Sequence, residues 1–230
     1  MEQTGTYRHE RKYRITAGEC CALRQRLRPV MQPDPHAGAD GRYLIRSIYF
    51  DNVQDKALRE KLDGVQRREK FRIRWYNDDL SFLTLEKKLK HNDLCLKLDA
   101  PLTEEECRRI LAGSAPWMRE HPAPLMRELY CKIRQQVLRP RVVVSYVREP
   151  YIYQAGNVRV TFDSHIRTSL FERDFAAGTP PDISATDAPG DTILEVKFDA
   201  FLPEVIRGLL QVGTLRQQAF SKYGACRRFG

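Results

Sequence analysis

Basic side chains recur at alternate positions in two neighbouring segments of the chain. Residues 71–75 read FRIRW, so Arg72 and Arg74 alternate with apolar residues. Residues 83–90 read LTLEKKLK and place Lys88 and Lys90 in the same relation to each other. Side chains two positions apart on a β-strand share a face, so both segments predict strands with one basic and one largely apolar face. Arginine and lysine are donors that suit phosphate oxygens, so phosphate binding is the first chemistry to consider.

Three glutamates lie on the same kind of face, each two residues before a lysine. They are Glu10, Glu86 and Glu195. Carboxylates among phosphate-binding cations are natural ligands for Mg²⁺ or Mn²⁺, hard ions that phosphates also coordinate. Neutralisation of the neighbouring lysine explains any one of these glutamates equally well, so the spacing leaves both roles open.

The elements that must position these side chains are mostly strands. Alternation predicts strands over residues 7–15, 42–51, 69–76, 81–90, 94–99, 141–148, 157–167 and 192–198, with a polar hairpin at 77–79. Helical spacing predicts helices over 18–31, 103–111, 124–138, 203–211 and 214–222, and a short helix or turn over 55–64. Thr103 and Glu106 form a capping-box pattern at one helix start. Residues 33–41 and 176–191 read as loops, and no repeat or linker divides the single domain expected over 1–230.

The charged strand faces have two explanations. An ordinary one-sided antiparallel sheet turns such faces to water. Here, however, Arg and Lys dominate the polar faces, whereas a solvated face mixes neutral polar residues with both charge signs. If the sheet curls into a barrel with its apolar faces under the helices, the cations point into the lumen and require a polyanion there. We therefore expect an α+β fold in which a closed antiparallel β-barrel has flanking helices.

Composition limits the class of partner. The chain has 230 residues, 39 basic against 30 acidic, for a formal net charge of +9, which favours an anionic partner. Phe71 and Trp75 alternate away from the cations and build no stacking platform beside them, which disfavours nucleic acid. No P-loop or Rossmann motif occurs. The six cysteines lack metal-binding spacing, and no secretory signal or membrane span is visible, so we expect a reduced, cytoplasmic protein without direct membrane insertion.

Eight short motifs, in order along nearly the whole chain, resemble one known family. They are ERKY at 10–13, SIYFD at 47–51, RIRWY at 72–76, LEKK at 85–88, SYVR at 145–148, RVTFD at 159–163, LEVK at 194–197 and FSKY at 220–223. Together they resemble the VTC (vacuolar transporter chaperone) domain, a branch of the CYTH or triphosphate tunnel metalloenzyme superfamily. The resemblance implies a barrel whose tunnel binds triphosphate with a divalent metal, Mn²⁺ or Mg²⁺.

The resemblance also implies roles for individual residues. Glu195 is the main expected metal ligand, with Glu10 and Glu86 as further ones. Five basic residues are expected to clamp the triphosphate and, with Glu195, to serve catalysis: Arg72, Arg74, Lys88, Arg148 and Arg159. Further expected phosphate ligands are Lys12, Tyr146, Ser221 and Lys222, with Lys90, Lys97 and Lys197 as additional tunnel cations.

The implied activity is polyphosphate synthesis, in which the terminal phosphoryl group of ATP passes to a growing chain. The alternatives are hydrolysis of tripolyphosphate or nucleoside triphosphate, and polyphosphate binding without turnover. Two departures bear on this choice. Arg8 stands where the wider superfamily has the first Glu of Glu-x-Glu-x-Lys, which weakens a two-metal hydrolase reading. Ala219 stands where the eukaryotic polymerases have a lysine, which removes one expected phosphate contact.

Overall fold

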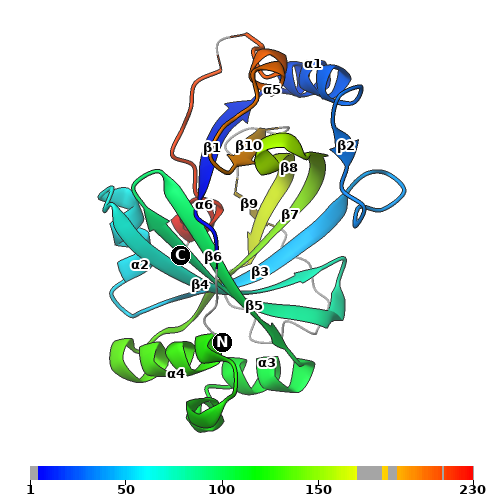
Figure 1. The fold of residues 1–230 in the computed structure, drawn as a ribbon. Coiled ribbons are helices and arrows are strands. Elements are labelled where there is room, and N and C mark those ends of the chain that lie inside the picture. Colours follow the sequence, from blue (N-terminus) through cyan, green and yellow to red (C-terminus); the bar gives the residue numbers. More distant parts are fainter. Residues whose placement is uncertain (1–4, 170–182, 186–190, 214, 230) are drawn as a thin grey trace.

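The computed structural model describes residues 5–169, 183–185, 191–213 and 215–229. Its strands form one antiparallel sheet of ten (Figure 1). In chain order they are β1 (Arg8–Ile15), β2 (Gln32–Pro33), β3 (Tyr43–Asp51), β4 (Arg67–Tyr76), β5 (Asp79–His91), β6 (Leu94–Leu102), β7 (Arg139–Tyr153), β8 (Val158–Ser169), β9 (Ile183–Ser184) and β10 (Thr192–Phe198).

Eight of these strands pair in a ring. The order is β7, β3, β4, β5, β6, β1, β10 and β8, and β8 pairs again with β7. A short ladder between β1 and β6 closes the ring, through the pairs Arg8–Cys95 and His9–Leu94. The two-residue strands β2 and β9 lie outside it, against β7 and β8.

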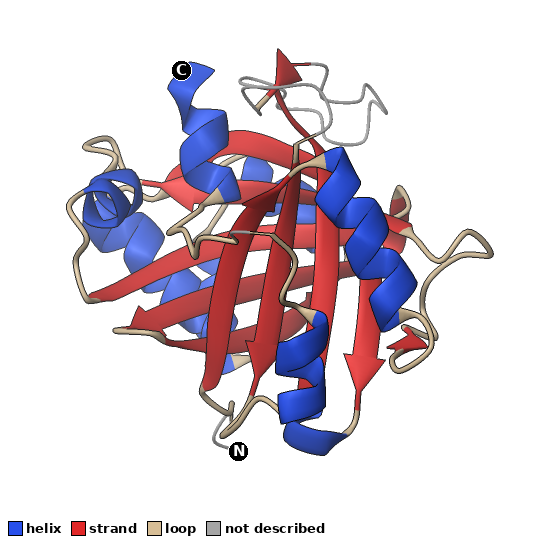
Figure 2. Cartoon of the chain, turned by 90° about the horizontal axis from the view of Figure 1, so that it is seen from above, coloured by secondary structure: helices blue, strands red, loops and turns tan. Residues whose placement is uncertain are grey.

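The described residues form six α-helices: α1 (Ala17–Leu27), α2 (Lys56–Leu62), α3 (Glu104–Leu111), α4 (Pro124–Gln136), α5 (Glu204–Leu209) and α6 (Lys222–Cys226). Of these, α1, α3, α4 and α5 cover the outside of the strands (Figure 2), whereas α2 and α6 contact each other and α6 also contacts β7 and β8. The helices α3 and α4 lie together at one end of the molecule, and α1 and α5 lie together at the other end (Figure 1). None of the described helices is long and apolar enough to cross a membrane. Short 3₁₀ turns lie at Pro116–Glu120, Ala155–Asn157 and Arg227–Phe229.

Apolar residues join these helices to the outer strand faces in two clusters. Ile73 and Trp75 on β4 are buried in a cluster with Leu125 and Leu129 of α4. The second cluster joins β8 and β10 to α1 and α5, with Ile206 of α5 fully buried in it. Burial of apolar area on this scale is the main force that holds helices on a sheet. The apolar strand faces therefore lie outward under helices, as the alternation predicted.

A third apolar cluster lies on the same side of the strands as the cations. It includes Tyr49, Tyr146 and Tyr223. Two of these rings are buried side by side, since the centroids of Tyr49 and Tyr223 are 5.2 Å apart. The sequence reading expected a basic interior and did not anticipate this apolar part of it.

Most predicted elements are present, with changed bounds. The helix expected over 18–31 ends at Leu27, and the strand expected over 141–148 runs from Arg139 to Tyr153. Thr103 caps α3 as predicted: its Oγ1 accepts from the Glu106 amide at 3.2 Å. Most of the loop expected over 176–191 lies outside the described residues.

The helix predicted over 214–222 is wrong. The described residues 215–221 are not helical, and α6 begins only at Lys222. The amide of Gln218 donates instead to the carbonyl of Lys12 on β1, at 2.8 Å. This contact with a strand outweighs the local helix propensity of the segment.

Candidate functional site

A cavity of about 390 Å³ lies within the ring of strands. Its walls carry eleven basic and only three acidic side chains, an excess of eight positive charges. The acidic residues are Glu10, Asp93 and Glu195, and the basic ones are Lys12, Lys61, Arg68, Lys70, Arg72, Arg74, Lys88, Lys90, Arg148, Lys197 and Lys222. So many like charges in one confined space are costly without a bound anion.

Strand alternation places these cations. Arg68, Lys70, Arg72 and Arg74 occupy every second position of β4 and all line the cavity. The residues between Arg72 and Arg74 and on either side of them are apolar and buried beneath the helices. The prediction of a basic inner face and an apolar outer face on β4 is confirmed.

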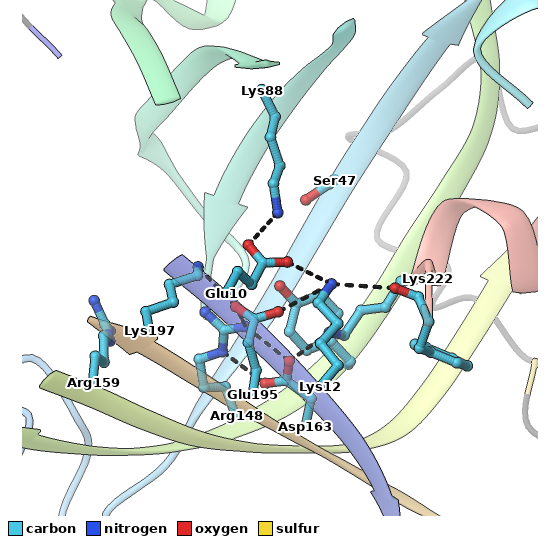
Figure 3. A network of polar contacts seen from close by, with 12 residues as sticks. Glu10, Lys12, Ser47, Lys88, Arg148, Arg159, Asp163, Glu195, Lys197 and Lys222 are labelled. Carbon is cyan, nitrogen blue, oxygen red and sulfur yellow. Dashed lines mark hydrogen bonds and ion pairs between the residues drawn. The ribbon is translucent and has the colours of Figure 1, made fainter. Parts of the chain in front are cut away.

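Lys12 is the centre of a network of ion pairs in the cavity (Figure 3). Its Nζ lies 2.9 Å from Glu10 Oε1 and 3.2 Å from Glu195 Oε2. Lys88 binds the other oxygen of Glu10 at 2.5 Å, and Lys197 binds Glu195 at 2.7 Å. Glu10 and Glu195 are therefore brought together, and each is shared between cations.

This network keeps the two glutamates ionised. Burial alone, and the charge of each glutamate on the other, would raise the pKa of Glu10, but Lys12, Lys88 and Lys197 together hold that pKa far below its ordinary value. The pKa of Glu195 is lowered well below its ordinary value by Lys197, Lys12 and Lys222, which outweigh its burial. Both side chains are carboxylates at any physiological pH.

Asp163 on β8 binds two of the predicted phosphate ligands, Arg148 and Lys222. It is fully buried and accepts from Arg148 Nε at 2.7 Å and Nη2 at 2.8 Å. Lys222 Nζ binds the same carboxylate at 2.5 Å (Figure 3). A two-pronged arginine–carboxylate contact holds the guanidinium in one orientation, so Asp163 positions Arg148 toward the cavity. In the sequence, Asp163 appears as the last residue of the RVTFD motif, and no role is predicted for it.

Glu86 lies apart from the other two predicted metal ligands. Its carboxylate accepts from Arg72 Nε at 2.6 Å and lies 3.7 Å from Arg74 Nη1. It is buried and does not line the cavity. The two arginines hold the pKa of Glu86 far below its ordinary value despite burial. Glu86 therefore orients the arginine pair in the structure described here.

Two predicted phosphate ligands lie outside the cavity walls. Arg159 donates to Asp34 and to the hydroxyl of Tyr43, both at 2.6 Å, and lies at the edge of the network in Figure 3. Lys97 is about half exposed and binds Asp99 at 3.2 Å. The other predicted ligands, from Lys12 to Lys222, are all found in the walls.

Residues 217–221, the segment before α6, complete the lining of the cavity. Gln217 and Gln218 line the cavity together with Ser221, whose side chain caps α6 by accepting from the Gly224 amide at 3.2 Å. The carbonyl of Phe220 accepts from Lys12 Nζ at 3.3 Å. These contacts hold Ser221 and Lys222 at the cavity, where the resemblance places phosphate ligands.

Comparison with known protein families supports the family that the eight sequence motifs resemble. The family model for the VTC domain matches residues 7–229. The chain belongs to the VTC domain family. No curated protein matches its sequence.

Solved structures resemble this VTC domain at low sequence identity. A protein from Bacillus halodurans described as a "putative adenylate cyclase" is 16% identical, with a TM-score of 0.51, over 90% of this chain and 87% of that chain. The PH1819 protein from Pyrococcus horikoshii is 12% identical, with a TM-score of 0.47, over 96% and 97% of the two chains. At 16% identity, the likeness to the Bacillus halodurans protein concerns the fold alone.

The donor set of this VTC domain fits one hard metal ion better than a larger cluster. Glu10 and Glu195 are ionised and both contact Lys12 Nζ, so their oxygens lie close together, and a metal ion bound between them would take the place of that ammonium group. Mg²⁺ in phosphate sites is held by one or two carboxylates plus phosphate oxygens, which this pair can supply. Among the described residues, no group of three or more acidic, histidine or cysteine side chains is arranged to hold a metal without such help.

Arg8 and Ala219, the two departures from the family pattern, differ in whether they line the cavity of this VTC domain. Arg8 donates to Asp199 at 2.7 Å, at the start of β1, and does not line the cavity. Ala219 does line it, so the lysine absent from this position would have faced the cavity.

Proposed function

We propose that this domain is a metal-dependent polyphosphate polymerase that transfers the γ-phosphoryl group of ATP to a growing polyphosphate chain. In this proposal the ring of strands is a closed barrel, and the cavity is part of a tunnel through it. The observation that carries the proposal is the excess of eight cations in the walls of one cavity in a VTC domain. Linear phosphate chains are compact and carry charge on each unit, which suits so narrow and basic a site.

The side chains of the cavity would act mainly by position and charge. Transfer of a phosphoryl group proceeds through a loose transition state, so catalysis needs alignment and charge stabilisation and no side-chain nucleophile. Arg72, Arg74 and Arg148 would hold the triphosphate in line, since Glu86 and Asp163 fix their guanidinium groups. An oxygen of the terminal phosphate of the existing chain would attack the γ-phosphorus, and ADP would leave.

Glu195 and Glu10 would hold the divalent ion. Bound there, Mg²⁺ or Mn²⁺ supplies positive charge that offsets the charge developing on the phosphate oxygens. Glu86 is a weaker candidate for this role because its buried carboxylate does not line the cavity.

A triphosphatase is the first alternative, and the electrostatics of the cavity argue against it. A general base works best with a pKa near the working pH. Glu10 and Glu86 are both held ionised, with pKa values far below their ordinary ones, which makes them weak bases. A binding module without turnover is the second alternative, and Ala219 favours it because this wall position lacks a cation.

One assay separates the three functions. The purified chain is incubated with ATP and Mn²⁺, and the products are resolved by length. We expect long polyphosphate; orthophosphate alone would point to the hydrolase, and binding without product to the module. Glu195→Gln should lower turnover about 100-fold or more, because the divalent ion that offsets the charge on the phosphate oxygens would lose its main carboxylate ligand. Glu120→Gln, an exposed glutamate far from the cavity walls, is the matched control. Undiminished turnover in Glu195→Gln would remove Glu195 from the mechanism.

A further inference from the structure

The cations at one end of the cavity differ from those at its centre. This basic end consists of Lys61, Arg68, Lys70 and Lys90, which line the cavity where β4 and β5 extend beyond the Arg72–Glu86 pair. Within the part of the chain that the structure describes, none of the four forms an ion pair with a carboxylate, whereas Lys12, Lys88, Lys197 and Lys222 all do. The one acidic wall residue near this end is Asp93, which is exposed.

The strand register makes this end repulsive. Arg68 on β4 lies directly opposite Lys90 on β5, and Lys70 lies opposite Lys88. Like charges at directly opposed positions destabilise a sheet. Two positions farther along, the same ladder pairs Arg72 with Glu86. The charges of the ladder are therefore compensated at the centre of the cavity and uncompensated at its end.

The neighbouring groups confirm that these cations lie close together. Burial lowers the pKa of Lys61, which reaches the cavity from α2, and the charges of Arg68 and Lys90 lower it further. Lys70 has only neutral contacts: its Nζ lies 3.3 Å from Ser221 Oγ and 4.8 Å from the centre of the Tyr223 ring. Burial and the charges of Arg68, Lys88 and Lys12 lower the pKa of Lys70 to about 7.

We propose that Lys61, Arg68, Lys70 and Lys90 form a subsite for phosphate groups beyond the first three, so that the cavity binds a long polyphosphate chain in preference to a triphosphate. This inference rests on the proposed function and adds a chain-length preference to it. A triphosphate held by Arg72, Arg74 and Arg148 leaves this end uncompensated, because Arg72 lies four positions along β4 from the opposed pair Arg68–Lys90. A longer chain places further phosphates opposite the two repelling strand pairs.

The test compares the affinities of two probes for the whole chain by titration calorimetry without divalent metal, which prevents turnover. The probes are tripolyphosphate and a long-chain polyphosphate. In the double variant Lys61→Gln/Arg68→Gln, we expect affinity for the long chain to fall about tenfold or more, since charged hydrogen bonds are lost. Affinity for tripolyphosphate should fall by a clearly smaller factor.

The matched control is Lys56→Gln/Arg59→Gln. It removes the same two charge types from the exposed side of α2, outside the cavity walls, and should lower neither affinity as strongly. Equal losses for both probes in the first variant, or equal losses in the control, would overturn the subsite. If the unaltered chain binds tripolyphosphate and long chains equally well, the subsite is wrong and the proposed function stands. If it binds neither, both proposals fail.

Discussion

The protonation of Lys70 should depend on whether an anion is bound in the cavity. Its ammonium has no carboxylate partner among the described residues, and three other cations lower its pKa further after burial. A phosphate placed beside it would favour the charged form and raise that pKa. Binding of an anion should therefore be coupled to uptake of a proton at Lys70 when the pH lies above about 7.

This coupling gives a prediction at the residue scale. Titration of tripolyphosphate at about pH 8, in two buffers of different ionisation enthalpy, measures the protons taken up on binding. We expect Lys70→Met to lower that number relative to the unaltered chain, by up to about one proton. The comparison between the two proteins cancels protons taken up by the ligand itself. An unchanged number would show that Lys70 is already charged in the free cavity.

The position of Lys70 was available from the sequence, because it precedes Arg72 by two residues on the same predicted strand. Its role was missed because alternation gives the face of a side chain and says nothing about its partners. Asp163 was missed for the same reason: its contacts with Arg148 and Lys222 cross between elements far apart in the chain. Lys61 lies on a helix, where no strand alternation points to the cavity.

At the scale of elements, the C-terminus of α4 carries local strain. Val137 caps this helix with φ of 53° and ψ of 44°, a left-handed conformation that disfavours a β-branched residue. Its side chain is 59% exposed, so little packing would be lost on its removal. We expect Val137→Gly to stabilise the protein by about 1 kcal/mol and to raise Tm by roughly 2–4 °C.

Thermal unfolding of two valine variants checks this prediction. Val53 is similarly exposed, at 52%, and is not among the described residues with positive φ. Val53→Gly should leave Tm unchanged or lower it, because glycine adds freedom to the unfolded chain without relieving strain. A fall in Tm for Val137→Gly would mean that Val137 makes contacts that outweigh its strain.

Strands were predicted better than the segments between them, for a physical reason. Alternation on β4 and β5 reports burial on one face, which the folded ring preserves. Residues 215–221 are instead placed by hydrogen bonds to β1, such as that from Gln218 to Lys12, and no local pattern records those partners. The ring itself depends on the short β1–β6 ladder, a contact between distant segments that the sequence suggested only through the excess of cations.

At the scale of the whole molecule, four buried carboxylates in or next to the cavity walls offset the repulsion among the cavity cations. Glu10, Glu86, Glu195 and Asp163 all have pKa values lowered by their basic partners, against the opposing effect of burial. A carboxyl group whose pKa is lower in the folded than in the unfolded state stabilises the fold above its unfolded pKa. That stabilisation is lost as the pH falls through 4.5 for the glutamates and 3.8 for the aspartate, toward the folded values.

Acid should therefore unfold this protein steeply, because protonation removes the carboxylates while the cations remain charged. Thermal unfolding between about pH 6 and 3 should show that Tm falls once the pH drops below the ordinary carboxyl pKa. Tripolyphosphate should oppose this fall by binding only the folded state.

Glu10→Gln should cost roughly 1–3 kcal/mol at neutral pH, since Lys88 loses its partner, and should make the dependence of Tm on acid pH shallower. Glu120→Gln, at an exposed site, should leave the curve unchanged. If Glu10→Gln shifts the curve downward without changing its slope, Glu10 contributes no proton linkage, and the acid sensitivity must come from the other three carboxylates.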